Sequence, residues 1–306
     1  MKLIIQPDDG VTPLVQAVKS AKKTIDIVIF RFDRVELEKA LEAAVARGVV
    51  VRALIAHTNR GGEKSLRKLE LRLLDAGVTV ARTADDLPRY HGKMMLIDGT
   101  LYVFGFNYTK LDIEKSRSFG IVTDAAKLVK DASELFEADC TRQAYKPSRD
   151  QLVVSPENSR ELLTEFIQKA KKELLIYDAK VSDRLMLRQL AERAKDGVDI
   201  RLFGKLGKGA IGIAARKLPD LRLHVRAIIR DGSAAFVGSQ SLRKLELDGR
   251  REIGVITSDD SIAKKMRAVF EADWALTPEA KQAAADKDKE KAKEKEKETE
   301  KATSGA

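Results

Sequence analysis

Cysteine is almost absent from this sequence, since Cys140 is the single one among 306 residues. An intrachain disulfide is therefore excluded, and so is a metal site built from several thiolates. No run of about 18 apolar residues occurs, which argues against a transmembrane helix. The opening segment MKLIIQPDDG becomes acidic too early for a signal peptide. We therefore expect a cytoplasmic protein, with peripheral contact to an anionic membrane as an open alternative.

Aromatic residues are also scarce, at 5% of the sequence, and histidine occurs only three times. Positive charge, in contrast, is abundant, because the formal net charge is +10. The segment 279–306 contains eight lysines and eight acidic residues, so the excess positive charge belongs to the preceding body. A basic body favours polyanions such as nucleic acid or an anionic lipid surface. A generally basic surface without a specific target is the alternative.

Two stretches of the sequence follow the same plan. The first is YHGKMMLIDGTLYVFGFNYT, which starts at Tyr90, and the second is LHVRAIIRDGSAAFVGSQSL, which starts at Leu223. Each carries a histidine, a cation two residues later, an aspartate seven later and a glycine fourteen later. In chain order these are His91, Lys93, Asp98 and Gly105, then His224, Arg226, Asp231 and Gly238. The constant offset of 133 residues indicates a duplication.

The surrounding chain alternates strand-like and helix-like segments. TIDIVIF and VVVRALIA are typical of buried strands, and the helix between them should be capped by Asp33 and ended by Gly48. LLIYD and VDIRLF, with Gly197 between them, repeat this order in the second half. The tetrapeptide Phe-Glu-Ala-Asp recurs late in each half, at 136–139 and 270–273. The order strand, helix, strand with short connections predicts parallel pairing.

We therefore predict an α/β fold of two tandem halves related by a pseudo-twofold axis, each a mixed, mostly parallel sheet flanked by helices. The predicted domains are residues 1–147 and 148–276, followed by a charged tail at 277–306. The tail has no apolar face, so we expect it to be disordered or a single solvated helix. A monomer is expected, because both halves lie in one chain.

The histidines at matched positions carry the functional prediction. A lone histidine beside a strand is more often structural than catalytic, but two in equivalent places require another explanation. Positions i and i+2 of a strand face the same side, so His91 should share a space with Lys93, and His224 with Arg226. A twofold axis would bring both pairs into one pocket that suits a phosphate ester.

The doubled pattern H-x-K/R-x4-D resembles that of the phospholipase D superfamily, and the resemblance extends over residues 3–274. It implies cleavage of a phosphodiester by two histidines, without a metal or another cofactor. One histidine attacks phosphorus and forms a phosphohistidine, while the other protonates the leaving oxygen and then activates water or an alcohol. The family order gives the attack to His91 and the acid role to His224. Lys93 and Arg226 would stabilise the phosphate oxygens.

The resemblance also suggests roles for the residues after each histidine. Asp98 and Asp231 complete the motif, and we expect them to hold strand ends and neighbouring donors rather than to move protons. The glycines would let the backbone approach the phosphate, and the polar side chains after them would donate to its oxygens. These residues are Gly105, Asn107, Gly238, Ser239 and Ser241.

Three positions depart from the family pattern. Arg226 replaces the usual lysine, and its planar guanidinium is not equivalent to an ammonium. Phe106 stands where serine is usual, which puts Asn107 one place early, and Ser241 takes the place of the second asparagine. These changes leave open a degraded site that binds polyanions without turning them over.

A carboxylate usually follows each histidine of this family at a similar distance along the chain and orients it. Glu252 stands 28 residues after His224, whereas Phe119 occupies that place after His91. The pattern therefore predicts that Glu252 orients His224 and leaves His91 without a carboxylate. By this criterion alone, His224 could instead be the more nucleophilic imidazole.

Three functions remain in competition. The first is a phospholipase D or cardiolipin synthase type of enzyme, which hydrolyses or transfers the phosphatidyl groups of phospholipids. The second is a metal-independent nuclease, and the third is the degraded polyanion-binding protein. The two fused halves favour the first, because small nucleases of the family resemble a single half that dimerises. The positive charge supports both enzymes equally.

Overall fold

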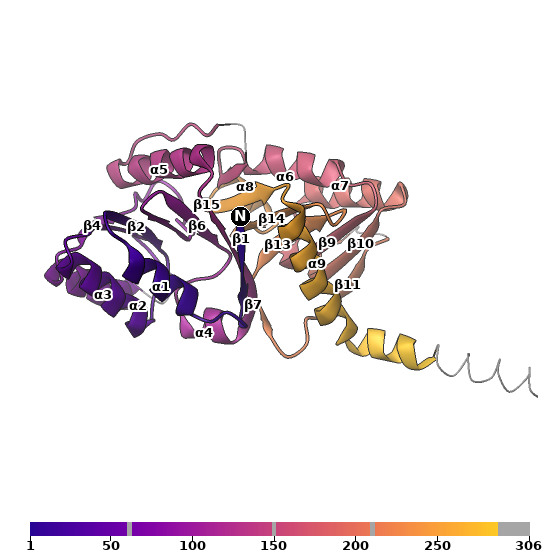
Figure 1. Ribbon diagram of the computed structural model, residues 1–306. Coiled ribbons are helices and arrows are strands. Elements are labelled where there is room, and N and C mark those ends of the chain that lie inside the picture. The colour runs from indigo at the N-terminus through magenta and orange to yellow at the C-terminus, as the bar shows by residue number, and fades with distance from the viewer. Residues whose placement is uncertain (60–62, 149–150, 209–211, 287–306) are drawn as a thin grey trace, which may run out of the picture.

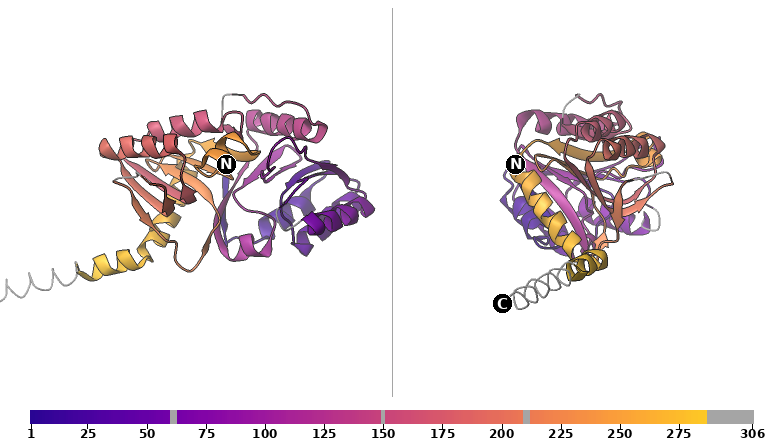
Figure 2. Two further views of the ribbon diagram at one scale, coloured as in Figure 1. Left: turned by 180° about the vertical axis from the view of Figure 1, so that it is seen from behind. Right: turned by 90° about the vertical axis from the view of Figure 1, so that its right-hand side faces the viewer.

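A computed structural model describes residues 1–59, 63–148, 151–208 and 212–286. Within these ranges the chain forms two mixed β-sheets with helices on their faces (Figure 1). Residues 278–286 form a helix that projects from the body (Figure 2). The remainder of the predicted tail, 287–306, lies outside the described residues, so its predicted state stays a prediction.

The first half supplies seven strands and five helices in the described ranges. They are β1 (Lys2–Gln6), α1 (Thr12–Ser20), β2 (Thr24–Ile29), α2 (Val35–Ala46), β3 (Val50–Ile55), α3 (Glu63–Asp75), β4 (Thr79–Arg82), β5 (Met94–Ile97), β6 (Thr100–Phe104), α4 (Lys110–Glu114), β7 (Ser116–Thr123) and α5 (Ala126–Thr141). These strands form a sheet in the order β1-β7-β6-β5-β2-β3-β4.

The second half repeats this arrangement with a shorter central part. Its elements are β8 (Leu152–Ser155), α6 (Ser159–Gln168), β9 (Glu173–Val181), α7 (Arg184–Lys195), β10 (Asp199–Leu206), β11 (Ala214–Arg216), β12 (Arg222–Leu223), β13 (Arg226–Arg230), β14 (Ala234–Gly238), α8 (Lys244–Asp248), β15 (Glu252–Thr257) and α9 (Asp260–Ala275). Its sheet has the order β11-β10-β9-β13-β14-β15-β8, while β12 pairs with β7 of the first half. The predicted α/β fold with two mixed sheets is confirmed, and we propose the domain division at residue 147.

The predicted predominance of parallel strands is wrong. Among the described strands, parallel pairing occurs within β2-β3-β4 and β9-β10-β11 and between β12 and β7, and the other neighbours pair antiparallel. The reason lies in short connections such as Asp98-Gly99, which joins β5 to β6 with φ of 48° and 83°. A two-residue Asp-Gly loop with positive φ at both positions closes a hairpin, and a hairpin forces antiparallel strands.

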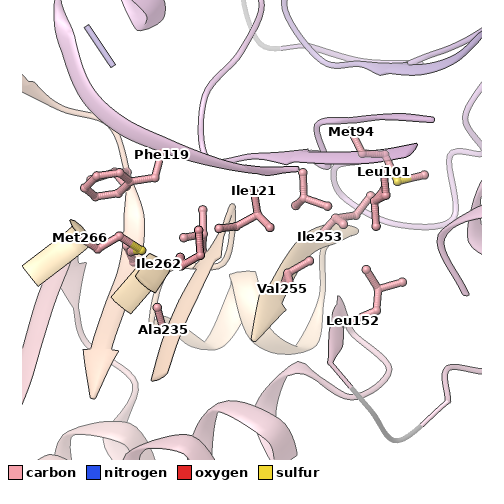
Figure 3. Packing of buried hydrophobic residues seen from close by; sticks show 14 of the residues in the cluster. Met94, Leu101, Phe119, Ile121, Leu152, Ala235, Ile253, Val255, Ile262 and Met266 are labelled. Atoms are coloured by element: carbon pink, nitrogen blue, oxygen red, sulfur yellow. The ribbon is translucent and has the colours of Figure 1, made fainter. Parts of the chain in front are cut away.

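One hydrophobic core joins the two halves. Helices α1, α2 and α3 cover the outer face of the first sheet, and α6 and α7 cover the outer face of the second. The inner faces of both sheets pack on each other together with α5 and α9. Figure 3 shows Phe119 and Ile121 of β7 facing Ile262 and Met266 of α9. Because apolar surface of each half is covered by the other, the halves hold a fixed relative position.

Two buried ion pairs cross between the halves in equivalent places. The guanidinium of Arg117 donates to both carboxylate oxygens of Asp273, at 2.9 and 3.0 Å. Arg251 in turn lies 3.0 Å from Asp139. The aspartates are the last residues of the repeated Phe-Glu-Ala-Asp tetrapeptides, so this repeat marks the contact between the halves.

Replacement of Asp273 by asparagine is expected to lower the free energy of unfolding by roughly 3 kcal/mol, because it removes the buried charge partner of Arg117 and leaves only the exposed Asp8 at 3.3 Å. Urea denaturation at neutral pH measures the change. The matched control is Asp260→Asn, which removes the exposed partner of Lys264. That variant should stay within about 0.5 kcal/mol of the parent. Equal losses in the two variants would contradict the structural role of the buried pair.

Candidate active site

Each histidine comes just before the first strand of a hairpin, at the place where the halves meet. His91 lies between β4 and β5, and His224 lies between β12 and β13. The chain around His91 is tied to the second half by its backbone, because the His91 amide donates to the carbonyl of Arg251 at 2.7 Å. Likewise, the Arg222 amide donates to Lys115 of the first half at 3.0 Å. Each histidine is therefore positioned partly by the opposite half.

His91 is held by three neighbours of different chemistry. Its Nδ1 atom lies 2.8 Å from Oε2 of Glu252, and the Lys93 ammonium lies 2.8 Å from its Nε2. The ring of Phe30 meets the imidazole at 77° with the centroids 4.5 Å apart. Burial lowers the pKa of His91 well below its ordinary value, and the charges of Lys93 and Arg226 add to this effect. The free site therefore holds His91 as a neutral imidazole near pH 7.

The position of Glu252 corrects the sequence prediction. Glu252 contacts His91 across the boundary between the halves and not His224 of its own half. The pairing of two backbone segments, one from each half, explains this contact. Tyr90 and Arg251 form a bridge between the halves, so the residues that follow them, His91 and Glu252, lie side by side. The prediction that His91 lacks a carboxylate is therefore wrong.

The carboxylate beside His224 is Asp112, which the sequence analysis missed. Asp112 Oδ2 lies 3.3 Å from His224 Nδ1, and Asp112 also receives hydrogen bonds from the backbone and side chain of Asn107, at 3.0 and 2.6 Å. Burial raises the pKa of Asp112, but the charge of His224 and the bonds from Asn107 outweigh it and lower the pKa. Asp112 therefore stays ionised. Asp112 is the third residue of the segment KLDIE, and Glu246 has the same place in the segment KLELD of the second half. This repeat is the signal in the sequence that could have identified Asp112.

The two motif cations differ in their surroundings. Lys93 is fully buried, and burial lowers its pKa to about 7 although the charge of Glu252 opposes the shift. Arg226 has the buried Asp178 as its electrostatic partner, and the charge of Arg226 opposes the rise in the pKa of Asp178 that burial causes. In the first half, where the motif cation is Lys93, the residue that corresponds to Asp178 is the uncharged Ile29. The arginine of the second motif is thus accompanied by its own carboxylate.

Asp98 and Asp231 lie away from the histidines and hold the starts of strands, as expected. Asp98 accepts hydrogen bonds from the amides of residues 22–24, at 2.7 to 2.9 Å. Asp231 accepts from the amides of residues 171–173, at 2.7 to 3.2 Å. Each carboxylate therefore fixes the connection from α1 to β2 or from α6 to β9.

Asp33 was predicted to cap the helix that follows β2, and this prediction is wrong. Its carboxylate instead accepts a hydrogen bond from the Lys110 amide at the start of α4.

The glycines of the motif are required by close packing of the backbone. A Cβ at Gly105 would lie 3.3 Å from the carbonyl oxygen of Gly238, so the two motifs approach each other there. A Cβ at Gly238 would lie 2.7 Å from the Cα of Gly254, on the neighbouring strand of its own half. A larger residue at Gly105 would therefore disturb the contact between the halves, and one at Gly238 would disturb the second sheet.

The polar residues after these glycines bind within the protein instead of facing a free space. Asn107 donates to Asp112, and Ser241 donates to Asp178 at 2.5 Å. Ser239 Oγ accepts from the Ile253 amide at 3.1 Å. The expected direct donation of these side chains to a phosphate therefore finds no support in their hydrogen bonds. Asn107 and Ser241 instead fix the carboxylates that accompany His224 and Arg226.

The comparison with known families decides where this chain belongs. A family model described as "Cardiolipin synthase, PLD-like domain" matches residues 14–140 and 203–274, more than half of the chain. The chain belongs to this phospholipase D-like family. A similar curated protein is the mitochondrial cardiolipin hydrolase of Danio rerio, with 27% identity over 128 residues, which are 40% of this chain and 53% of that protein. The chain thus spans about half the length of that relative.

Two solved structures share the fold over most of this phospholipase D-like chain. The polyphosphate kinase of Porphyromonas gingivalis matches with a TM-score of 0.72 and 20% identity, covering 88% of this chain and 49% of the kinase. The phosphatidylserine synthase of Haemophilus influenzae matches with a TM-score of 0.64 and 10% identity, covering 89% and 85%. These likenesses concern the fold alone. None of the helices in the described ranges is long and apolar enough to cross a membrane.

Proposed function

We propose that this protein cleaves or transfers phosphodiesters through a phosphohistidine, with phospholipids as its substrates. The observation that carries the proposal is the crossed arrangement of His91 with Glu252 and His224 with Asp112. In each pair the histidine and the carboxylate come from different halves. Both imidazoles and the cations Lys93 and Arg226 would then contact the same phosphate.

The first step forms a bond between His91 and phosphorus while the bond to the leaving oxygen breaks. His224 gives its proton to that oxygen. In the second step His224 takes a proton from water or an alcohol, whose oxygen attacks phosphorus and displaces His91. Lys93 and Arg226 stabilise the charge that develops on the phosphate oxygens. The protonation states of His91 and His224 are restored at the end of the cycle.

The carboxylates support His91 as the nucleophile. Burial raises the pKa of Glu252, although the charge of Lys93 opposes it, so this carboxyl stabilises an imidazolium weakly. Burial also lowers the pKa of His224 well below its ordinary value, but there the ionised Asp112 opposes the effect. Because this carboxylate stabilises an imidazolium at His224, we assign the acid role to His224. His91 stays neutral with Nδ1 bound to Glu252, which leaves Nε2 for attack once a phosphate oxygen engages Lys93.

Exposed aliphatic residues support a lipid substrate and peripheral contact with an anionic membrane. Val35 and Leu111 are 58% and 50% exposed at the starts of α2 and α4. Leu185 and Leu245 lie at the starts of α7 and α8, and they are also exposed. Such residues on a basic body can enter the lipid interface. A cytoplasmic monomer that acts without a metal or another cofactor stays part of this proposal.

Nucleic acid is the second candidate substrate, and the charge of the chain favours it. The sequence pI is about 9.5, and several arginines surround the histidines. A polyanion-binding protein without turnover is the third candidate, which rests on Arg226 and Phe106 at places where the family has lysine and serine.

A substrate panel in the presence of EDTA is expected to show release of a head group or transfer between lipids. The purified protein is assayed on phosphatidylcholine and phosphatidylglycerol in mixed micelles, and on single-stranded and duplex DNA. The variant His224→Ala controls for contaminating enzymes. Cleavage of DNA but not of lipid would replace the lipid proposal by the nuclease. Tight DNA binding without turnover of any substrate would favour the third candidate.

A further inference from the structure

Three cations surround the ring of Phe30 next to His91. Phe30 directly follows β2 and is buried, with 3% of its surface exposed. The guanidinium carbons of Arg31 and Arg89 lie 5.8 and 5.5 Å from the ring centroid, and the Lys93 ammonium lies 5.4 Å from it. The His91 imidazole meets an edge of the same ring system. We call these residues the Phe30 cluster.

The two arginines of the Phe30 cluster have no acidic partner of their own. In the part of the chain that the structure describes, neither Arg31 nor Arg89 forms an ion pair, and Arg31 Nε donates instead to the Asn59 amide oxygen at 3.3 Å. Burial lowers the pKa of Arg89, and the nearby charges of Arg250 and Arg31 lower it further, while the charges of Glu252 and Glu246 oppose the shift. Arg31 is exposed and Arg89 is half-buried, so an anion from solution can reach both guanidiniums, and its charge would offset their mutual repulsion.

The equivalent places of the second half, all within the described residues, do not form such a group. Arg222 stands two residues before His224, as Arg89 stands two residues before His91, but its Nη1 atom lies 2.5 Å from Asp112. The places of Phe30 and Arg31 are taken by Ala179 and Lys180. The excess of positive charge therefore lies on one defined side of the reacting centre.

A cavity of about 300 Å³ adjoins the Phe30 cluster. Arg31 lines it together with Ser65, Thr109 and the carboxylates of Asp33 and Asp112, whereas Arg89 is not among its described lining residues. Asp112 contacts His224, so the cavity lies beside the reacting centre. Its guanidinium and hydroxyl groups can donate hydrogen bonds to an anion, while the two carboxylates are already bound, Asp33 to the Lys110 amide and Asp112 to Asn107 and Arg222.

We propose that Arg31 and Arg89 form a subsite for a second phosphate of the substrate, on the His91 side of the phosphodiester that is cleaved. The proposal rests on the proposed function, because it concerns the substrate of the same site. A phosphodiester has one negative charge, and Lys93 and Arg226 already face it. The two further guanidiniums, which can be reached from solution, can bind a further anion, and a second phosphate a few atoms away supplies it.

The test compares two chromogenic substrates that differ by one phosphate. These are the p-nitrophenyl ester of thymidine 5′-phosphate and the same ester with an added 3′-phosphate. The parent should prefer the second compound. Arg31→Gln and Arg89→Gln should raise its KM roughly 10–100-fold, the worth of a charge-assisted hydrogen bond, and should affect the first compound much less. Lys180→Gln, at the equivalent exposed place of the second half, should preserve the preference.

A lipid pair identifies the source of the second phosphate. Phosphatidylglycerol has one phosphate and cardiolipin has two, and both are presented in mixed micelles of a neutral detergent. A selective loss on cardiolipin would identify a lipid with two phosphates, and a selective loss on the thymidine pair alone would identify a nucleotide chain. No preference of the parent in either pair, or equal losses on both members of a pair, would overturn the subsite.

Failure of the proposed function can be distinguished from failure of the subsite. If the parent turns over none of the four compounds, calorimetry compares its binding of thymidine 3′,5′-bisphosphate and thymidine 5′-phosphate. A preference for the bisphosphate that Arg31→Gln abolishes would support the subsite in a protein without the proposed activity. Equal binding of the two nucleotides would exclude it.

Discussion

Replacement of His91 by alanine is expected to reduce turnover of bis(p-nitrophenyl) phosphate by at least ~10²–10⁴, the usual worth of a positioned reacting group. The loss follows because His91 is the imidazole that Glu252 and Lys93 hold in place for attack on phosphorus. Steady-state release of p-nitrophenolate measures kcat. Near-full activity would remove His91 from the mechanism.

The variant His224→Ala separates the acid from the nucleophile. It should also lose at least ~10² in steady-state turnover, but p-nitrophenolate leaves without protonation, so the first step should persist. We expect a burst of p-nitrophenolate and a stable phosphohistidine, which an alkaline quench and peptide mass spectrometry can locate on His91. A phosphopeptide that contains His224 in the His91→Ala variant would reverse the two roles.

Replacement of Asp112 by asparagine is expected to lower kcat at pH 7 by at least ~10², since a carboxylate that orients a catalytic histidine can be worth up to ~10⁴. The substitution should also shift the pH dependence of kcat in a definite direction. Asp112 raises the pKa of His224 against the effect of burial, so its removal lowers that pKa further. The protonated acid then persists only at lower pH, and the alkaline limb of the kcat profile should move to lower pH.

Glu252→Gln provides the matched control on the other histidine. Glu252 opposes the lowering of the Lys93 pKa, which is about 7, so its removal should make Lys93 lose its charge at lower pH. Turnover should fall, and the burst itself should slow, because the nucleophile is affected. With Asp112→Asn the p-nitrophenolate burst should be largely preserved. Identical burst rates and unchanged pH profiles in both variants would discard the orienting roles.

The duplication and the motif could be predicted because they depend on neighbours in the sequence. The offset of 133 residues between His91 and His224 identified the two halves, and the Phe-Glu-Ala-Asp repeat marked their ends. The same pattern placed Asp98 and Asp231 correctly as structural residues. Each of these inferences needs only local spacing and the chemistry of the residue types.

The partners of the histidines could not be predicted in this way. Counting along the chain paired Glu252 with His224, whereas a bridge between Tyr90 and Arg251 places Glu252 at His91. Asp112 was missed because the match between the segments KLDIE and KLELD carries no information about a contact with His224. Ser241 and Asn107 were expected to face a phosphate, but they bind buried carboxylates that lie far away in the chain or on a neighbouring helix.

By itself, the sequence determined that this protein has two equivalent α/β halves, which residues form the repeated motif, and that the body is basic. These properties follow from spacing and composition. Only the tertiary structure decided that each histidine takes its carboxylate from the opposite half and that Arg31 and Arg89 gather around Phe30. Such contacts depend on how the halves pack through their shared core, and packing joins residues whose separation in the chain carries no information about their distance in space.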